Sequence, residues 1–210
     1  MNHKGLLIIV SGPSGAGKGT ICKELLQRDP SILVSVSATT RQPRNGEQDG
    51  ISYHFLTRDR FENMIQNNGF LEHACVYNNY YGTPKDFVVE QISSGKNVLL
   101  EIDIQGALQV KNKYPEGVFV FILPPSMKTL KTRIEGRGSE TPESLKMRLS
   151  SAVSEIELIK NYDYFIVNDT VNHATDILQA IITAEKCRVN ADIKEIVRRF
   201  KEETNVKTID

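Results

Sequence analysis

The feature that most constrains the fold is the glycine-rich segment from Gly12 to Thr20, which reads GPSGAGKGT. It follows the apolar run Leu6 to Val10 and precedes a stretch in which Ile21, Leu25 and Leu26 share one helical face. Glycines let the backbone turn tightly enough for successive N–H groups to face an anion, and the N-terminus of the following helix adds a favourable dipole. The segment therefore predicts a P-loop that holds the phosphates of a nucleoside triphosphate. The residues expected to bind them are Gly12, Pro13, Ser14, Gly15, Ala16, Gly17, Lys18, Gly19 and Thr20.

One position of this loop departs from the usual P-loop. Gly19 follows Lys18 where a Ser or Thr commonly ligates Mg²⁺, so we expect the metal to be held mainly through water and phosphate oxygens. An acidic element is expected at the end of a neighbouring strand, and Glu101 and Asp103 supply it on one face of the run Val98 to Ile104. Asp103 is a candidate to contact Mg²⁺ through water. The alternative interpretation of both carboxylates is a solvated strand end.

Several apolar runs rich in β-branched residues have the length and composition of buried strands. They are Leu6 to Val10, Val98 to Ile104, Val118 to Leu123 and Tyr164 to Val167. Helical stretches lie between them, such as Pro84 to Ser94, which we expect to start with Thr83 as its cap and to end at Gly95. This alternation predicts an α/β fold with a central parallel sheet flanked by helices on both faces.

Two segments lack the pattern of the core. Residues 35–83 are polar and rich in turn signals, with strand-like pieces such as Tyr53 to Leu56, and predict a small inserted subdomain. Residues 126–162 predict two helices joined at Gly136 to Thr141, the second opening with Pro142 behind a Thr141 cap. This pair of helices is a candidate lid.

The rest of the chain divides into the core and a C-terminal extension. The core comprises residues 5–34, 84–125 and 163–185, and the extension comprises residues 186–210. In the extension, Ile193, Ile196, Val197 and Phe200 keep helical spacing among charged neighbours. This pattern predicts a surface helix packed on the core or on another subunit.

Composition argues against several classes of function. The 26 Lys and Arg residues equal the 26 Asp and Glu residues, and a net charge of zero argues against non-specific binding to nucleic acid or to an anionic membrane. The longest apolar runs are far shorter than the roughly 20 residues that span a membrane. The 3 cysteines are too few and scattered for a disulfide framework, and no secretion signal is recognised, so we expect a cytoplasmic protein.

Basic residues are expected to offset the charge of bound nucleotides locally. Arg41 and Arg44 lie in the inserted segment, and Arg133 and Arg137 are one helical turn apart at the rim of the candidate lid. On the following helix, Arg148 falls on the side of the apolar stripe, where it either lies over the core or points at a ligand. With Lys18, these arginines suit a phosphoryl-transfer site, since its charge-spread transition state is stabilised by such clamps.

These motifs together resemble the guanylate kinase family from about residue 5 to about residue 185. The matching stretches are Ser11 to Thr20, Ser35 to Arg44, Gly50 to Phe55, Asn79 to Thr83, Glu101 to Gly106, Arg133 to Gly138, Glu140 to Arg148 and Val167 to Asp169. The resemblance implies a P-loop kinase with a GMP-binding insert and a mobile lid. It implies the reaction of ATP with GMP or dGMP to give ADP and the diphosphate, with Mg²⁺, in purine nucleotide metabolism.

The resemblance also implies roles for individual residues. Catalytic roles fall to Lys18, Arg41, Arg133, Arg137 and Arg148. Asn168 and Asp169 would join the P-loop in binding ATP. The residues implied to bind GMP are Ser37, Glu72 and Thr83 at the guanine, Arg41, Arg44, Tyr53 and Tyr81 at the phosphate, and Glu101 and Asp103 near the metal. A carboxylate such as Glu72 can accept both the N1–H and the N2–H₂ donors of guanine, whereas adenine would leave it unpaired.

Other functions remain as alternatives. A non-catalytic module of the same family, which binds protein partners, usually loses the P-loop lysine or glycines, whereas Lys18 is present. A kinase that acts on AMP, UMP or dTMP is the nearest enzymatic alternative. A GTP-switch protein is disfavoured because the chain has no Asn-Lys-x-Asp motif. The partners expected are ATP and GMP, with either a monomer or a homo-oligomer as the assembly.

Overall fold

The central sheet of the computed structural model consists of five parallel strands, β1 (Leu7–Ser11), β2 (Leu33–Val34), β7 (Val98–Glu101), β8 (Val118–Leu123) and β9 (Tyr164–Val167). Their order across the sheet is β2-β7-β1-β8-β9. The structure describes residues 4–76, 78–136, 142–189 and 193–205. Every residue of β1 is buried, because helices cover the sheet on both sides.

Alternate residues of β1 contribute to two separate cores. Ile8 and Val10 pack with α1 (Lys18–Arg28) and α7 (Val171–Lys186), while Leu7 and Ile9 pack with α3 (Lys85–Ser93) and α4 (Ile104–Lys113). This alternation is the period of two expected of a strand buried on both faces. The predicted α/β fold with a parallel sheet between helices is therefore confirmed.

The inserted segment forms a sheet of its own. Its strands β3 (Ala38–Thr39), β4 (His54–Phe55), β5 (Phe70–Val76) and β6 (Asn79–Pro84) lie in the order β4-β3-β6-β5 beside α2 (Arg58–Gln66). A small core of Ala38, Phe61 and Phe70 joins α2 to this sheet. We call this unit the insert sheet.

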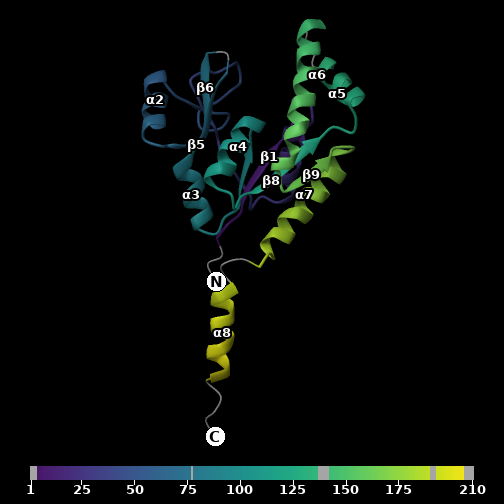
Figure 1. The fold of residues 1–210 in the computed structure, drawn as a ribbon. Coiled ribbons are helices and arrows are strands. Elements are labelled where there is room, and N and C mark those ends of the chain that lie inside the picture. The colour runs from purple at the N-terminus through teal and green to yellow at the C-terminus, as the bar shows by residue number, and fades with distance from the viewer. Residues whose placement is uncertain (1–3, 77, 137–141, 190–192, 206–210) are drawn as a thin grey trace.

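A helical arm lies opposite the insert sheet. It consists of α5 (Met127–Glu135) and α6 (Pro142–Ile156), followed by a 3₁₀ helix (Glu157–Asn161), and is held together by Leu130, Ile134 and Ala152. The insert sheet and the helical arm rise on opposite sides of the carboxyl end of the central sheet (Figure 1). Both units therefore flank the edge where ligands bind in parallel α/β sheets.

Several local predictions are corrected. The run Val98 to Ile104 is a strand only as far as Glu101, because Asp103 caps α4 by accepting the N–H of Gly106 at 2.7 Å. Helix α3 begins at Lys85 after Pro84, and Thr83 does not cap it, since its hydroxyl group donates to Glu72 instead. The cap predicted at Thr141 lies outside the described residues.

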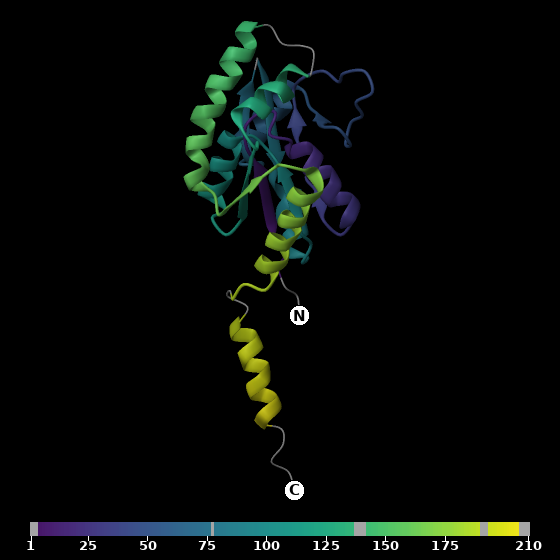
Figure 2. The same ribbon diagram turned by 90° about the vertical axis from the view of Figure 1, so that its right-hand side faces the viewer.

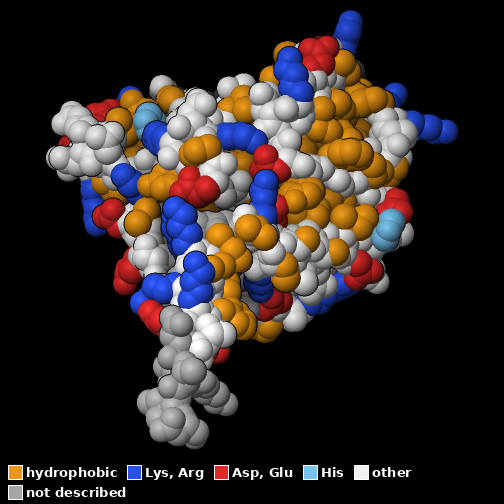
Figure 3. Space-filling model, turned by 60° about the horizontal axis from the view of Figure 1, so that its bottom comes forward, with side chains coloured by type: hydrophobic (Ala, Val, Ile, Leu, Met, Phe, Trp, Pro, Cys, Tyr) orange, Lys and Arg blue, Asp and Glu red, His pale blue; other side chains and the backbone are white. Residues whose placement is uncertain are grey.

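The predicted C-terminal helix is α8 (Ile193–Asn205), and none of its described residues belongs to a hydrophobic core cluster. It extends away from the body in both ribbon views (Figures 1 and 2). Seen from the end where it projects, the molecular surface mixes basic, acidic and apolar side chains (Figure 3). Among the helices in the described ranges, none has the length and apolar character required to cross a bilayer.

Candidate active site

The P-loop leaves the carboxyl end of β1 and leads into α1. Gly12 has a φ of 146°, and a Cβ atom there would lie 2.3 Å from the carbonyl oxygen of Ile122 on β8, so only glycine fits. Helix α1 starts at Lys18, and the residue that caps it, Gly17, has no side chain to accept the first N–H groups. The loop therefore presents backbone donors and the positive end of the helix dipole to an anion.

A cavity of about 510 Å³ lies over the P-loop. Loop residues from Gly12 to Thr20 form one wall, and Glu101, Asp103 and Glu155 contribute to the others. The structure thus brings both predicted carboxylates to the phosphate loop and adds Glu155 of α6, which sequence reasoning missed. Glu155 follows Arg148 by two helical turns and so shares its face of α6, but its place at the cavity depends on how α6 packs, which the sequence does not indicate.

Lys18 lies among these carboxylates. Its Nζ atom donates to the carbonyl oxygens of Gly12 at 2.6 Å and of Pro13 at 3.2 Å. Desolvation lowers the pKa of Lys18, while the charges of Glu101 and Glu155 oppose this shift. Desolvation also raises the pKa of both carboxyl groups. The ammonium group is thus positioned to exchange its carbonyl acceptors for phosphate oxygens.

Gly19 packs directly against Glu101. A Cβ atom at position 19 would lie 3.2 Å from Oε1 of Glu101, so a hydroxyl-bearing side chain there would require the carboxylate to move by a few tenths of an ångström. In residues 4–76, 78–136, 142–189 and 193–205, no three His, Cys, Asp or Glu side chains group as metal ligands. The oxygen donors that line the cavity, Glu101, Asp103 and Thr20, suit Mg²⁺, which keeps several waters and uses few protein ligands.

Asn168 and Asp169 follow β9 beside the P-loop. Nδ2 of Asn168 donates to the carbonyl oxygen of Ala16 at 2.7 Å, whereas its buried Oδ1 has no hydrogen-bond partner among the described residues. Arg133 on α5 donates to the carbonyl oxygens of Ala16 at 3.3 Å and of Asn168 at 3.0 Å. Asp169 is exposed and contacts His173 at 2.9 Å. Arg133 and Asn168 therefore join the P-loop to the helical arm and to the end of β9.

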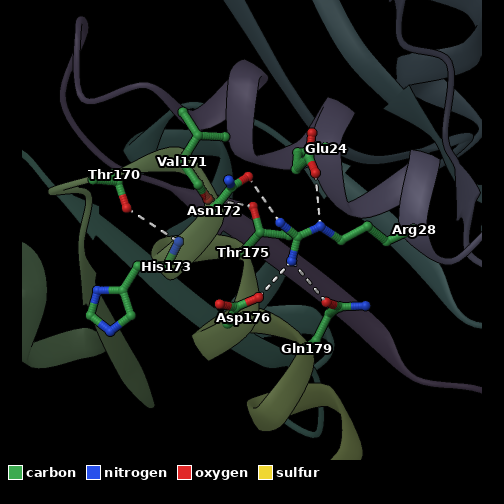
Figure 4. A network of polar contacts seen from close by, with 9 residues as sticks. All are labelled: Glu24, Arg28, Thr170, Val171, Asn172, His173, Thr175, Asp176 and Gln179. Carbon is green, nitrogen blue, oxygen red and sulfur yellow. Dashed lines mark hydrogen bonds and ion pairs between the residues drawn. The ribbon is translucent and has the colours of Figure 1, made fainter.

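A polar network fixes α1 to α7 (Figure 4). Arg28, at the end of α1, donates to Glu24 at 2.8 Å and, across the helix interface, to Asp176 at 2.6 Å and Asn172 at 3.1 Å. The network thus adds polar contacts between α1, the helix that begins in the P-loop, and α7, the helix that follows Asn168 and Asp169.

The residues expected to read guanine lie on neighbouring strands of the insert sheet. Strands β3 and β6 pair antiparallel with Ala38 opposite Gly82, a register that puts Ser37 opposite Thr83. From β6, Oγ1 of Thr83 donates to Oε1 of Glu72 on β5 at 2.6 Å. Glu72 is only 6% exposed, and burial raises the pKa of its carboxyl group against the opposing effect of the Thr83 bond.

Gly106 makes room for this carboxylate. A Cβ atom at Gly106 would lie 2.9 Å from Oε2 of Glu72 and 3.3 Å from Oδ1 of Asp103. The first turn of α4 thus lies between the two carboxylates, with Asp103 facing the P-loop cavity. The charge of Asp103 also helps to raise the pKa of Glu72.

The residues expected to bind the phosphate of GMP gather where β3 ends. The guanidinium carbon of Arg41 lies 5.5 Å from the centre of the Tyr53 ring, and the rings of Tyr53 and Tyr81 meet edge to face with centroids 6.1 Å apart. Arg44 is exposed nearby in the chain. Sequence reasoning missed Glu47, whose carboxylate pairs with Arg41 at 2.9 Å.

The remaining arginines belong to the helical arm. Arg148 is half-buried on α6, and it does not line the P-loop cavity formed by the described residues. Arg137 lies outside the described residues. Arg133 contacts backbone oxygens beside the loop, so the cavity holds Lys18 but not these arginines in this conformation.

Comparisons with known proteins agree on one family. The model of the guanylate kinase family matches residues 4–185. The guanylate kinase of Clostridium perfringens (strain SM101) is 58% identical over 202 residues, which are 96% of this chain and 93% of that protein. The guanylate kinase of Clostridium acetobutylicum is 59% identical over 202 residues, 96% of each chain. The crystal structure of guanylate kinase from Anaplasma phagocytophilum matches with a TM-score of 0.76 and 32% identity, covering 94% of this chain and 95% of that one. The chain therefore belongs to the guanylate kinase family.

Proposed function

We propose that this chain is an ATP:GMP phosphotransferase, which moves the γ-phosphoryl group of ATP to GMP and releases ADP and GDP. The observation that carries the choice of acceptor is the buried pair of Glu72 and Thr83. Its carboxylate is separated from the P-loop cavity only by the first turn of α4. If Glu72 binds the guanine base, the rest of the GMP molecule would lie between the insert sheet and the phosphates of ATP.

The chemistry of Glu72 favours guanine over the other bases. An ionised carboxylate only accepts hydrogen bonds, and guanine offers two adjacent donors, N1–H and N2–H₂. Adenine has an acceptor at N1, so a buried Glu72 would lose a partner and keep its desolvation penalty. We assign Ser37 and Thr83 to the same base because Thr83 donates to Glu72 and the strand register puts Ser37 opposite Thr83.

On the donor side, we assign the phosphates of ATP to Gly12 to Thr20 and the adenine to Asn168 and Asp169. The location of Asn168 supports this assignment, since it follows β9 and its side chain contacts the P-loop. The Nδ2 atom is held by the carbonyl oxygen of Ala16, which fixes the orientation of the amide.

Mg²⁺ accompanies ATP in this proposal and would neutralise charge on the transferred phosphoryl group. Glu101 and Asp103 are the groups that would hold it, chiefly through water, because Gly19 supplies no hydroxyl ligand and no cage of protein ligands surrounds the cavity in the described residues.

Lys18, Arg41, Arg133, Arg137 and Arg148 would stabilise the charge of the transition state. In-line phosphoryl transfer needs little covalent chemistry from the protein, so correctly placed cations supply most of the catalysis. We infer that the helical arm, within residues 126–162, is a lid that brings Arg137 and Arg148 to the phosphates. The insert of residues 35–83 would bind GMP, and the core of residues 5–34, 84–125 and 163–185 would bind ATP. Residues 186–210 would form an extension outside this domain.

The test is a coupled assay for ADP release with GMP, AMP, UMP and dTMP as separate acceptors. We expect GMP to exceed the other acceptors by several orders of magnitude in kcat/KM. Similar rates across the panel would overturn the assignment of Glu72, Ser37 and Thr83 to guanine, while leaving the P-loop assignment intact.

A further inference from the structure

Glu47 is the centre of a set of contacts that hold Arg41. Its carboxylate accepts from Nη1 of Arg41 at 3.0 Å and from Nη2 at 2.9 Å, so that both terminal nitrogens of the guanidinium group are engaged. The pair is partly shielded from solvent, since the side chain of Arg41 is 15% exposed and that of Glu47 is 22% exposed. The hydrogen bonds that Arg41 donates to Glu47 raise the pKa of Arg41 and lower the pKa of Glu47. Both groups are therefore charged and paired.

Glu47 also fixes the backbone turn that carries Arg44, the second arginine assigned to the phosphate of GMP. Its Oε2 atom accepts the backbone N–H of Arg44 at 2.7 Å, and its own N–H donates to the carbonyl oxygen of Arg44 at 3.0 Å. Gly46 lies inside this turn with a φ of 86° and open space around the position of a Cβ atom, so the backbone angle is what requires glycine. One carboxylate thus closes the turn and holds Arg41 against it.

The remaining contacts of Arg41 fix its orientation further. Nη1 donates to the carbonyl oxygen of Gln42 at 2.8 Å, and the guanidinium group lies over the ring of Tyr53 at 5.5 Å. A carboxylate that takes one N–H from each terminal nitrogen leaves the Nε edge of the guanidinium group for a second bidentate acceptor. That edge is suited to a phosphate.

We propose that Glu47 is a positioning residue, which holds Arg41 and the Arg44 turn in the geometry that receives the phosphate of the acceptor nucleotide. The inference rests on the proposed function, because it gives Arg41 the phosphate of GMP as its ligand. Glu47 itself does not touch the substrate. It acts by fixing Arg41 before the substrate arrives, so that less side-chain freedom is lost on binding.

The sign of one mutational effect separates this role from a purely electrostatic one. Glu47 is a negative charge close to the site of a dianionic phosphate, so simple electrostatics predicts that Glu47→Gln strengthens the binding of GMP. A positioning role predicts weaker binding of GMP instead, because the glutamine side chain of this variant cannot accept from both terminal nitrogens of Arg41. We expect Glu47→Ala to weaken GMP binding by about tenfold or more. Glu47→Gln keeps one oxygen acceptor and should show a smaller loss.

The experiment measures the dissociation constants of GMP, guanosine and ATP by titration calorimetry or competition, together with KM and kcat. We expect both variants to lose affinity for GMP while their affinities for guanosine and ATP stay within about twofold of wild type. An equal loss for guanosine and GMP would mean that the insert sheet has been disrupted, and would overturn a role confined to the phosphate.

Glu62→Gln is the matched control. Glu62 lies in the same insert, pairs with Arg58 at 2.9 Å, and its removal changes the net charge of the chain by the same amount. We expect this variant to bind GMP as the wild type does. Unchanged or tighter binding of GMP by both Glu47 variants would overturn the positioning role while leaving the proposed function intact. Failure of the wild type to bind GMP would overturn both.

Discussion

Replacing Glu72 with glutamine tests the guanine site with a minimal change of shape. In the structure, Oε1 of Glu72 accepts the hydroxyl of Thr83 at 2.6 Å, and Oε2 lies beside Gly106. In the variant, the Thr83 hydroxyl favours the amide oxygen of the new side chain at the Oε1 position. The amide nitrogen then occupies the position of Oε2, where its N–H groups would face the N–H donors of guanine with no acceptor between them.

The expected loss follows from this exchange. A hydrogen bond to a charged group contributes about 1.5–3 kcal/mol, and a buried donor left unpaired costs a further ~1–3 kcal/mol. A combined loss of about 3–5 kcal/mol corresponds to a fall in kcat/KM for GMP of about 10²–10⁴-fold. Stability should not fall at pH 7, because burial raises the pKa of Glu72 and the fold therefore favours an uncharged side chain there.

The assay compares GMP with IMP, which lacks the N2 amine, in the wild type and in Glu72→Gln. In the wild type, loss of the amine should reduce kcat/KM by about 10–100-fold, the value of one hydrogen bond to a charged acceptor. In the variant, this difference should shrink by at least about tenfold, since the carboxylate partner of the amine is gone.

Two outcomes would contradict these roles of Glu72. An unchanged ratio of GMP to IMP in the variant would show that the carboxylate does not receive the N2 amine. A large fall in the melting temperature of the variant at pH 7 would show that the charge of Glu72 stabilises the fold, contrary to the direction of its pKa shift.

Three further perturbations probe the site. Arg148→Ala should lower kcat by about 10²-fold and change GMP affinity little, because we assign Arg148 to stabilising the transition state. Steady-state kinetics that show only a raised KM for GMP would refute this assignment. Gly106→Ala should raise the KM for GMP by about tenfold, because its Cβ atom would lie 2.9 Å from Oε2 of Glu72, and unchanged KM values for both substrates would contradict it. Because burial raises the pKa of Glu72 above its ordinary 4.5, its neutral form favours folding below that value, and this contribution is lost as the pH rises through the raised pKa. The affinity for guanosine, which lacks the phosphate group that itself titrates at about pH 6, should rise over the same window because the anion accepts the N–H groups of guanine. Titrations from pH 4.5 upward should show this rise in the wild type and not in Glu72→Gln.

Strands β1, β7, β8 and β9 of the central sheet were predictable because each contains a continuous apolar run, whereas the two-residue strand β2 was not predicted. β8 and β9 have the predicted bounds, since Val118–Leu123 and Tyr164–Val167 are continuous apolar runs. The end of β7 could not be predicted, because Asp103 suits a strand end as well as a helix cap. Only its hydrogen bond with Gly106 decides between the two. The insert sheet was less visible, since Phe70–Val76 alternates apolar and polar residues irregularly.

Predicting the site depended on whether a residue's partner is close in sequence. The P-loop is local, so its glycines, its lysine and the following helix can be recognised together. Glu47 lies in a turn whose backbone angles depend on Gly46, and nothing in the spacing from Arg41 predicts a bidentate pair. Glu155 faces the cavity only because α6 packs on α5 in one particular orientation. These contacts require the tertiary structure.

The contact between Gly19 and Glu101 restricts how this loop can change during evolution. A serine at position 19 would crowd a carboxylate that already lies 3.2 Å from the position of its Cβ atom. A shorter acid at position 101 would relieve the crowding, because its carboxylate would end farther from the Cβ position of residue 19. The two positions are therefore physically coupled, and a serine at position 19 should be accommodated more easily when position 101 carries aspartate.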